Sequence, residues 1–317
     1  MSGAEWDYKQ NGRDWASVDV ADNKCGMKNQ SPIDLKRRGW PVVDAAEDNF
    51  NKFYTNQKGD IAVVWNGHTS QTAVNKEGQD LQKFESQISK DKFGGGTRFN
   101  GVQFHFHHGS EHTVDGERYD LEMHTVHLAE DPSGDVKYAA MGILFSVDDY
   151  DEVRQDEEWL YTTINEFFDN LEWTETGANP NVSEVTYGDL MMAVDMESRW
   201  VYKGSVTTPP CDTYVYWNVV RRVYPIKAHH LHQFKQQMLR SDILQYGNYR
   251  DTVPVDDHDP MVLRPLNRSP PNTAALFIAL LILAIVVVIL LFMVFALYKD
   301  IQKQNKEEQL ASVENAH

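Results

Sequence analysis

One segment near the C-terminus limits what this chain can fold into more than any other. Residues 274–298, AALFIALLILAIVVVILLFMVFALY, form a run of 25 residues without a charged side chain. At about 1.5 Å per residue, a helix of that length exceeds the roughly 30 Å hydrocarbon core of a bilayer. A buried helix of a large soluble protein is the alternative, but such helices rarely run so long without a charge. The segment therefore predicts one C-terminal transmembrane helix.

The rest of the 317-residue chain has the pattern of one folded domain and two short polar segments. Residues 266–273 are rich in proline, serine, threonine and asparagine, which is typical of a linker. Upstream of them we find no second change of composition and no repeat at a fixed period. The predicted organisation is a domain over residues 1–265, a linker over 266–273, the membrane helix over 274–298 and a polar tail over 299–317.

The net charge excludes one broad class of partner. The chain has 30 Lys and Arg residues against 47 Asp and Glu residues, which gives a net charge of −17. Binding to a phosphate backbone needs clustered cations, so we expect no nucleic-acid partner. With 41% hydrophobic and 11% aromatic residues, the chain can bury a substantial core.

Strand-like patterns dominate the predicted domain. Five short runs are rich in β-branched and aromatic residues and are bounded by turn residues; they cover residues 61–65, 101–107, 121–128, 139–147 and 214–223. Only residues 153–170 and 228–239 show apolar side chains at clear helical spacing. The sequence therefore predicts a mostly β domain with peripheral helices, followed by the transmembrane helix.

The histidines are concentrated in one stretch, since six of the 12 lie between positions 105 and 127. In a strand over residues 102–107, alternation places Gln103, His105 and His107 on one face. The residues between them then face a core: Val102, Phe104 and Phe106. Two histidines on one strand face can converge on a metal ion, although a lone histidine on a strand is more often structural.

A third histidine, His124, shares a strand face with Glu122 in the following strand. If the two strands pair as a hairpin through a turn at Asp115 and Gly116, His124 completes a three-histidine site. Three neutral imidazoles with an open fourth position form the ligand set of catalytic zinc. A cupin barrel, with Glu111 as a carboxylate ligand, is an alternative, but the sequence lacks the glycine-led turn and the second histidine box of that fold.

The histidine strands resemble those of the α-class carbonic anhydrases, and the resemblance extends along the chain. The motifs that carry it are QFHFH at 103–107, SEHTVDG at 110–116, LEMH at 121–124, NQSPID at 29–34, NGH at 66–68, GSVTTPP at 204–210, Trp217, and RPL at 264–266. They span about residues 6–268. The resemblance implies a central, largely antiparallel sheet and a zinc lyase that reversibly hydrates CO₂ to bicarbonate and a proton.

The resemblance also assigns the metal site. It implies three ligands for Zn²⁺, namely His105, His107 and His124. Gln103 and Glu122 would orient the ligand rings from behind. His112 resembles a supporting histidine beside Glu122, whereas we expect His127 to be part of the buried packing.

The residues around the metal take further implied roles. Thr207 would orient the attacking oxygen while donating its own proton to Glu111, and Thr208 would line the bicarbonate site. Because CO₂ carries no net charge, its pocket is expected to be apolar; the residues that the resemblance implies for it are Val126, Ala140, Val206 and Trp217.

Each reaction cycle must also release a proton. His68 would pass it to buffer, since an imidazole with a pKa of about 6.5 both binds and releases protons at neutral pH. Tyr8 and Asn66 resemble residues that order water between the metal and this histidine. A histidine in a surface loop, without such a role, is the alternative.

Cys25 and Cys211 are the only cysteines, and both flank family motifs. Secreted members that this chain resembles join these positions by a disulfide, which persists only in an oxidising compartment. The sequon Asn181-Val182-Ser183 fits the same compartment. The first residues, however, show no basic region and no apolar stretch of a signal peptide. We expect the domain on the oxidising side of a membrane; a tail-anchored protein with its domain in the cytosol is the alternative.

Two functions from different classes follow from the resemblance. The first is a membrane-anchored carbonic anhydrase, with CO₂ and bicarbonate as its small-molecule partners and a transporter or membrane complex as its candidate protein partner. The second is a membrane-displayed binding or adhesion module built on the same fold. The three histidines, Glu111, Thr207 and His68 favour the enzyme, because a binding module has no physical need for them.

Overall fold

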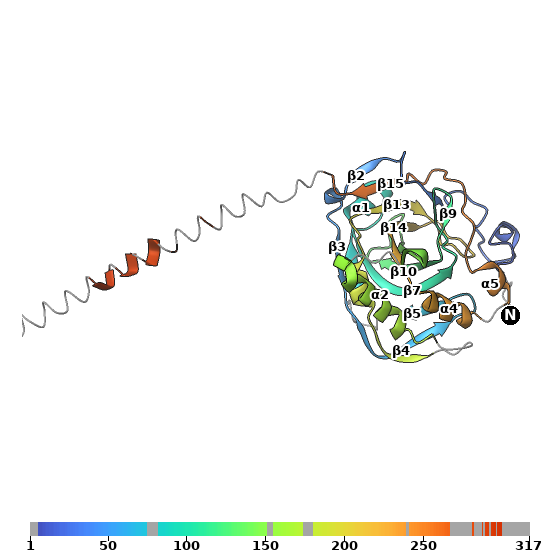
Figure 1. Cartoon of the computed structure of the whole chain (residues 1–317). Coiled ribbons are helices and arrows are strands. Elements are labelled where there is room, and N and C mark those ends of the chain that lie inside the picture. Colours follow the sequence, from blue (N-terminus) through green and yellow to red (C-terminus); the bar gives the residue numbers. More distant parts are fainter. Residues whose placement is uncertain are drawn as a thin grey trace, which may run out of the picture. The chain divides into compact units, whose positions relative to one another are not determined.

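A computed structural model of the chain describes residues 6–74, 82–150, 155–173, 180–238 and 241–266, and eleven residues between positions 281 and 299. The chain divides into two compact units, Met1–Leu266 and Asn267–His317. The first unit contains every named helix and strand of the described residues (Figure 1).

Short strands make up most of the first unit. The strands are β1 (Asp34–Leu35), β2 (Val42–Asp44), β3 (Asn51–Tyr54), β4 (Gln57–Trp65), β5 (Ser70–Ala73), β6 (Gln82–Glu85), β7 (Arg98–His108), β8 (Thr113–Val114), β9 (Glu117–Arg118), β10 (Leu121–Ala129), β11 (Tyr138–Ser146), β12 (Asn181–Val185), β13 (Arg199–Gly204), β14 (Val215–Pro225) and β15 (Met261–Arg264). The helices are α1 (Gln87–Phe93), α2 (Glu158–Asn170), α3 (Tyr187–Ala193), α4 (Ala228–Gln237) and α5 (Ser241–Tyr246).

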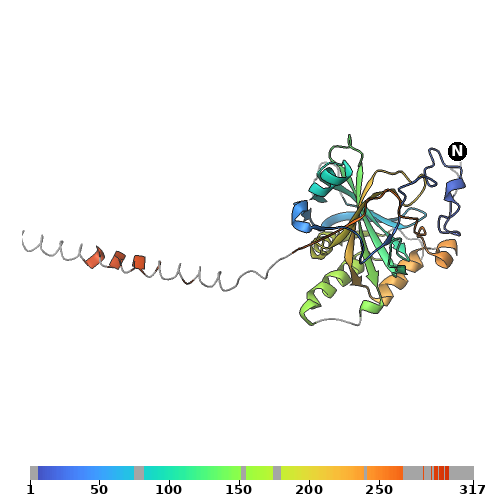
Figure 2. The ribbon, with the colours of Figure 1, turned by 90° about the horizontal axis from the view of Figure 1, so that it is seen from above.

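Twelve of these strands form one large sheet. Its order is β12-β4-β5-β7-β10-β11-β14-β13-β15-β2, and β3 joins it through β6, which pairs with β7. Among the described pairs of this sheet, β11 with β14 and β15 with β2 are parallel, and the others are antiparallel. The helices lie around the sheet (Figure 2). The predictions of a mostly β domain, a largely antiparallel sheet and peripheral helices are therefore confirmed.

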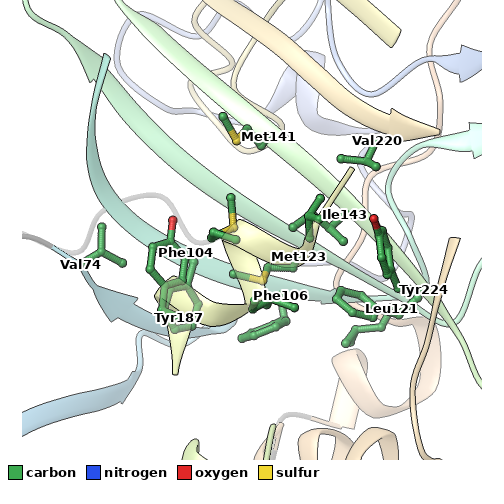
Figure 3. Close-up of a cluster of buried hydrophobic side chains, with 14 of the residues drawn as sticks. Val74, Phe104, Phe106, Leu121, Met123, Met141, Ile143, Tyr187, Val220 and Tyr224 are labelled. Atoms are coloured by element: carbon green, nitrogen blue, oxygen red, sulfur yellow. The ribbon is translucent and has the colours of Figure 1, made fainter. Parts of the chain in front are cut away.

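One face of the central strands forms the main core. The side chains that project from this face in Figure 3 include Phe104 and Phe106 from β7, Leu121 and Met123 from β10, and Met141 and Ile143 from β11. Tyr187 of α3 stacks on Phe104 with ring centroids 5.1 Å apart. Burying each such side chain contributes roughly 1.5–3 kcal/mol. Because side chains alternate along a strand, the residues between them project to the opposite face, where the histidines lie.

Val102 departs from the predicted alternation. Its side chain is 41% exposed, so the prediction that it faces the core is wrong. Gln103 of β7 pairs with Val126 of β10. The next pair is Gly101 with His127, so the register shifts by one residue at this point. The bulge leaves Val102 without a partner in β10 and turns its side chain outward.

The strands β7 and β10 pair in antiparallel fashion, as predicted, but they do not form a simple hairpin. The turn at Asp115 and Gly116, which both have positive φ, connects β8 to β9 instead. Strand β8 also pairs with β1, in a separate three-stranded sheet. The chain between β7 and β10 therefore makes a detour, and this detour positions Glu111 and His112.

Both predicted helices are confirmed, with shifted ends. Helix α2 begins at Glu158 and follows a 3₁₀ turn over Gln155–Glu157, while residues 151–154 lie outside the described residues. Helix α4 ends at Gln237. The apolar residues at helical spacing in α2 are buried, as the pattern predicts: Leu160, Ile164, Phe167 and Phe168.

Most of the second unit, including the predicted linker beyond Leu266, lies outside the described residues. Those that are described between positions 281 and 299 are all helical. A search of the described residues finds no helix with the length and apolar character needed to cross a membrane. Most of the predicted transmembrane segment, residues 274–298, is outside the residues searched.

Candidate active site

A cavity of about 250 Å³ lies on the histidine face of the large sheet. Of the residues predicted for the site, those that line it are Tyr8, Asn66, His68, Gln103, His105, His107, His124, Val126, Ala140, Val206, Thr207, Thr208 and Trp217. Three more predicted residues, Glu111, His112 and Glu122, are fully buried and hydrogen-bond behind the cavity lining.

The cavity has two regions of different chemistry. We call His105, His107, His124 and Thr207 the polar wall. We call Val126, Ala140, Val206 and Trp217 the apolar wall. Strand β10 contributes to both, because His124 and Val126 lie two residues apart on the same strand face.

Three histidines converge in the polar wall. His105 of β7 and His124 of β10 are directly paired across the two strands, and His107 is two residues along β7. One ring nitrogen from each histidine lies within 4.8 Å of the others. His107 and His124 are buried, and His105 is half-buried. The predicted convergence of the three rings is therefore present.

The second nitrogen of each ring contacts an oxygen atom. His105 Nδ1 lies 2.9 Å from Gln103 Oε1, and His107 Nδ1 lies 2.7 Å from the carbonyl oxygen of Asn248. His124 Nε2 lies 2.9 Å from Glu122 Oε1. Each acceptor holds the ring proton on its own side, which leaves the other nitrogen with its lone pair toward the cluster.

The cluster fits a metal ion of the zinc type. His107 Nε2 is buried without a hydrogen-bond partner, which is costly for a polar atom unless something else binds it. Three neutral imidazole nitrogens that converge on one point match the donors and the ligand number of a catalytic zinc site.

Burial and neighbouring charges shift the titration of these groups. Burial and the other two rings hold the pKa of His105 well below 6.5. Burial also lowers the pKa of His107 against the opposing charge of Glu111. For His124 burial is opposed by Glu122, whose carboxylate raises the pKa above 6.5. Burial disfavours the Glu122 charge, but His112 and His124 outweigh it and hold the Glu122 pKa well below 4.5.

A buried polar network supports His124. Glu122 Oε1 accepts from His112 Nδ1 at 2.7 Å, and Glu122 Oε2 accepts from the His112 backbone N–H at 2.8 Å. His112 Nε2 contacts the hydroxyl of Tyr202 at 2.6 Å, and this hydroxyl donates to Ser31 Oγ at 3.0 Å. The predicted position of His112 beside Glu122 is therefore present, and the network extends two residues further.

Glu111 differs from its predicted arrangement. Its Oε1 accepts the backbone N–H of Arg250 at 2.8 Å. Its Oε2 is buried without a hydrogen-bond partner, 3.5 Å from His107 Nε2 and 3.8 Å from His124 Nδ1. The expected hydrogen bond from Thr207 to Glu111 is therefore not formed, because the carboxylate is turned toward the two rings.

The apolar wall consists of side chains from three strands and one loop. Ala140 of β11 pairs with Trp217 of β14, and both are almost fully buried. Trp217 Nε1 donates to the carbonyl oxygen of Ser205 at 3.0 Å, which satisfies its one polar atom inside the apolar surface. Tyr138 and Val215 extend this surface along the cavity.

His68 lies at the cavity lining between β4 and β5. The side chain of Asn66 accepts the backbone N–H groups of His68 and Thr69, both at 3.0 Å, and thereby fixes this turn. The His68 ring stacks on Trp6 with centroids 3.9 Å apart and planes 9° apart. Tyr8 contacts the same ring edge-on at 6.2 Å.

Comparison with known proteins decides the family. The family model of the eukaryotic-type carbonic anhydrases matches residues 10–259. The chain belongs to this family. Its relatives include carbonic anhydrase 6 of Canis lupus familiaris, which is 28% identical over 264 residues, or 78% of this chain and 74% of the relative. A carbonic anhydrase of Nostoc sp. is 32% identical over 213 residues, or 67% of this chain and 69% of the relative.

A solved structure shares the fold but carries a different name. Dioscorin complexed with ascorbate matches with a TM-score of 0.61 and 22% identity, over 83% of this chain and 99% of that chain. Family membership makes this chain a carbonic anhydrase by class, that is, an enzyme whose substrates are CO₂ and bicarbonate. Carbonic anhydrases of the α class are zinc enzymes, and the three-histidine cluster can hold the metal.

The disulfide expected from the carbonic anhydrase resemblance is present between Cys25 and Cys211. It joins the N-terminal segment to the loop that carries Thr207. The backbone N–H of Lys24 donates to the carbonyl oxygen of Pro210 at 2.8 Å beside it. A disulfide between the only two cysteines indicates an oxidising compartment.

The sequence motifs did not identify several residues of this carbonic anhydrase site. Asn248 and Arg250 hold His107 and Glu111 through backbone groups, and their side chains contact several loops. Trp6, which stacks on His68, gave no motif of its own. Tyr138 could have been found, because it is two residues before Ala140 on the same strand face.

Proposed function

We propose that this protein is a zinc-dependent carbonic anhydrase that catalyses the reversible hydration of CO₂ to bicarbonate and a proton. The observation that carries the proposal is the convergence of three ring nitrogens, from His105, His107 and His124, beside an apolar cavity wall. A polar wall can bind a metal and a water molecule, while an apolar wall accepts an uncharged substrate.

His105, His107 and His124 would hold the zinc ion. When bound, zinc lowers the pKa of a water molecule to about 7, a shift for which carbonic anhydrases are the standard example. Gln103, Glu122 and the Asn248 carbonyl group keep each ring in the required tautomer.

The apolar wall would position CO₂ next to the polar wall. Ala140 and Val206 are small, so the wall leaves room for the substrate. Thr207, which is 4% exposed, would accept a hydrogen bond from the attacking oxygen and so aim a lone pair at the carbon. For Thr207 to donate to Glu111 in turn, the carboxylate has to rotate away from the histidines. Thr208 would contact the bicarbonate formed.

His68 would carry the released proton from the cavity to buffer. It lines the same cavity as the three histidines, is half-buried, and stacks on an aromatic ring that limits its orientations. Tyr8 and Asn66 line the cavity beside it and would order the intervening water.

A binding module on the same fold is the second candidate. Its support is the dioscorin structure, which has this fold and was solved with ascorbate bound. Such a module needs a cavity but no set of inward-facing ring nitrogens. The tautomer control at all three histidines therefore favours the enzyme.

We further propose that residues 1–265 form the catalytic domain, that residues 266–273 link it to a membrane helix over 274–298, and that residues 299–317 form a polar tail. The uncharged run of 25 residues supports the helix. The apolar side chains described in that run are all exposed, by 47–64%. The disulfide supports a domain on an oxidising side of the membrane, with a transporter or membrane complex as the candidate protein partner.

His107→Ala tests the enzymatic proposal. We expect loss of bound zinc and a fall in CO₂ hydration of about 10³-fold or more, since the attacking water regains its ordinary pKa. Stopped-flow hydration and elemental analysis measure the two quantities. Val102→Ala, on the same strand but facing outward, is the matched control. Full CO₂ hydration by His107→Ala without metal would disprove zinc dependence. Absence of hydration by the unaltered, zinc-loaded chain would favour the binding module.

The membrane proposal has a separate test. The full chain, expressed with membranes, should stay in the membrane pellet after extraction with alkaline carbonate. Recovery in the soluble fraction would contradict the anchor and leave the catalytic proposal untouched.

A further inference from the structure

A second cluster of metal-ligating side chains lies away from the cavity. Among the described residues, three groups can bring ligand atoms within 4.8 Å of one another, and two of them share His124. The third group consists of Asp169, His229 and His230. Asp169 belongs to the last turn of α2, and the two histidines belong to the first turn of α4. These helices lie side by side in Figure 2, where α2 is green and α4 is orange.

His230 is the fixed member of this cluster. Its side chain is fully buried, and its ring packs against Phe168 with centroids 5.5 Å apart. His230 Nε2 lies 2.7 Å from Asp169 Oδ1. The other nitrogen, Nδ1, is buried without a partner. In this contact Nε2 carries the proton and donates it to the carboxylate. To bind an ion beside Asp169, the ring would move this proton to Nδ1 and present the lone pair of Nε2 to the ion.

His229 and Asp169 are the adaptable members. The His229 ring contacts the His230 ring with centroids 4.0 Å apart. His229 is exposed, and the Asp169 side chain is 61% exposed. Both can therefore move by the few tenths of an ångström that separate a hydrogen bond of 2.7 Å from the roughly 3.3 Å between two ligand atoms in a tetrahedral zinc site.

The charges around the cluster favour a cation on one side and oppose it on the other. Asp169 is an acidic residue at the negative end of a helix whose last turn has no basic residue. A cation there would relieve this repulsion. The N-terminus of α4 and the nearby Lys227 oppose a cation, although Lys227 lies over the ring of Tyr150 at 5.9 Å.

We propose that Asp169, His229 and His230 form a second, peripheral site for Zn²⁺ that joins the end of α2 to the start of α4. Two imidazoles and one carboxylate are a common zinc ligand set, and the exposed side leaves the fourth position to water. None of its ligands lines the cavity. The site is therefore independent of the proposed catalytic zinc.

The position of the site suggests what its metal would stabilise. Phe168 of α2 and Phe234 of α4 both contact Phe106, with ring centroids 6.1 Å and 5.6 Å away. Phe106 lies between His105 and His107 on β7. A metal ion that joins the two helices would therefore reinforce the packing directly behind the polar wall.

The test uses the full chain loaded with one equivalent of zinc. Titration with Zn²⁺ by isothermal calorimetry, with elemental analysis after dialysis against micromolar zinc, should show a second equivalent. His229→Ala should weaken the second site by at least about tenfold, the loss that even outer-shell changes cause at metal sites. His232→Ala removes another exposed histidine of α4 and is the matched control.

Asp169→Asn gives a second variant that keeps the shape of the side chain. We expect this variant to bind only one equivalent of zinc. Excess Zn²⁺ should raise the melting temperature of the unaltered chain but not that of Asp169→Asn. Binding of only one equivalent by the unaltered chain would overturn the proposal. Equal losses of affinity for the second zinc ion in His229→Ala and His232→Ala would also overturn it. CO₂ hydration with one equivalent should be the same in all three variants.

Discussion

The two walls of the cavity share strand β10 but are built by different means. In the polar wall, each histidine is held by one directed contact, from Gln103, Asn248 or Glu122. In the apolar wall, Ala140 and Val206 are held by nondirectional packing, and Trp217 adds only one hydrogen bond. The geometry of the polar wall therefore depends on individual hydrogen-bonding atoms, whereas that of the apolar wall depends on the volume of its side chains. We expect substitutions to be costly in the first and tolerated in the second.

The largest expected effect concerns a buried histidine in the core behind the two walls. His127 of β10 is buried, its Nε2 lies 2.9 Å from the hydroxyl of Tyr54, and burial lowers its pKa to about 3. Its folded pKa is below the unfolded value of about 6.5, so its contribution to stability is complete above pH 6.5 and is lost as the pH falls toward 3. Between pH 6.5 and 4.5 the free energy of unfolding should fall by about 2 kcal/mol.

Urea unfolding of the full chain at the two pH values measures this change. His127→Gln keeps a polar contact for Tyr54 but cannot titrate, so most of the pH dependence should disappear. An unchanged slope in that variant would show that other groups dominate the acid response.

Glu122→Gln tests the directed contacts of the polar wall. The amide oxygen can accept from the two rings, but the amide NH₂ group cannot accept the His112 backbone N–H as Oε2 does. The network behind His124 is therefore disturbed, and the zinc dissociation constant should rise by about 10- to 100-fold. Competition with a chelator measures it. Glu85→Gln alters an exposed carboxylate of β6 and should change nothing. A zinc affinity equal to that of the unaltered chain would break the comparison between the walls.

His68→Ala tests a residue that lines the cavity without belonging to either wall. We expect kcat for CO₂ hydration to fall by about tenfold in weak buffer, less than is usual for a side chain that transfers protons, because buffer partly replaces it. Added imidazole should restore the rate. His232→Ala is the control. If the kcat of His68→Ala did not depend on buffer concentration, His68 would not be part of the proton path.

Ala140→Val should have the smallest effect. The apolar wall gains two methyl groups, which should change kcat/KM for CO₂ by at most about threefold and the stability by less than about 1.5 kcal/mol. Stopped-flow assays and urea unfolding provide the two values. A loss as large as that of Glu122→Gln would show that the apolar wall is as demanding as the polar one.

Much of both walls could be predicted from the sequence because strand alternation is local. His105 and His107 are two residues apart, and so are His124 and Val126, which fixes their common face without any tertiary information. The order of the family motifs along the chain then assigned Thr207 and Trp217 to the same site. Even here a bulge reversed the direction of Val102, since a shift of register depends on the partner strand.

The supports of the polar wall could not be predicted in this way. Asn248 is 141 residues from His107 and contacts it through a backbone carbonyl group, which every residue possesses. Tyr202 reaches His112 across 90 residues. The orientation of the Glu111 carboxylate depends on the backbone N–H of Arg250, which is 139 residues away. Such contacts leave no local pattern in the amino-acid sequence.

The single disulfide has a consequence for how this enzyme could be made. Trp6 and Tyr8, which line the cavity, precede Cys25, and Thr207 precedes Cys211 by four residues. The crosslink thus joins the segment that follows the first residues of the cavity lining to the loop that carries Thr207. A chain that folds under reducing conditions would retain all three histidines but lack the disulfide. Its catalytic rate would therefore indicate whether it folded in a reducing or an oxidising compartment.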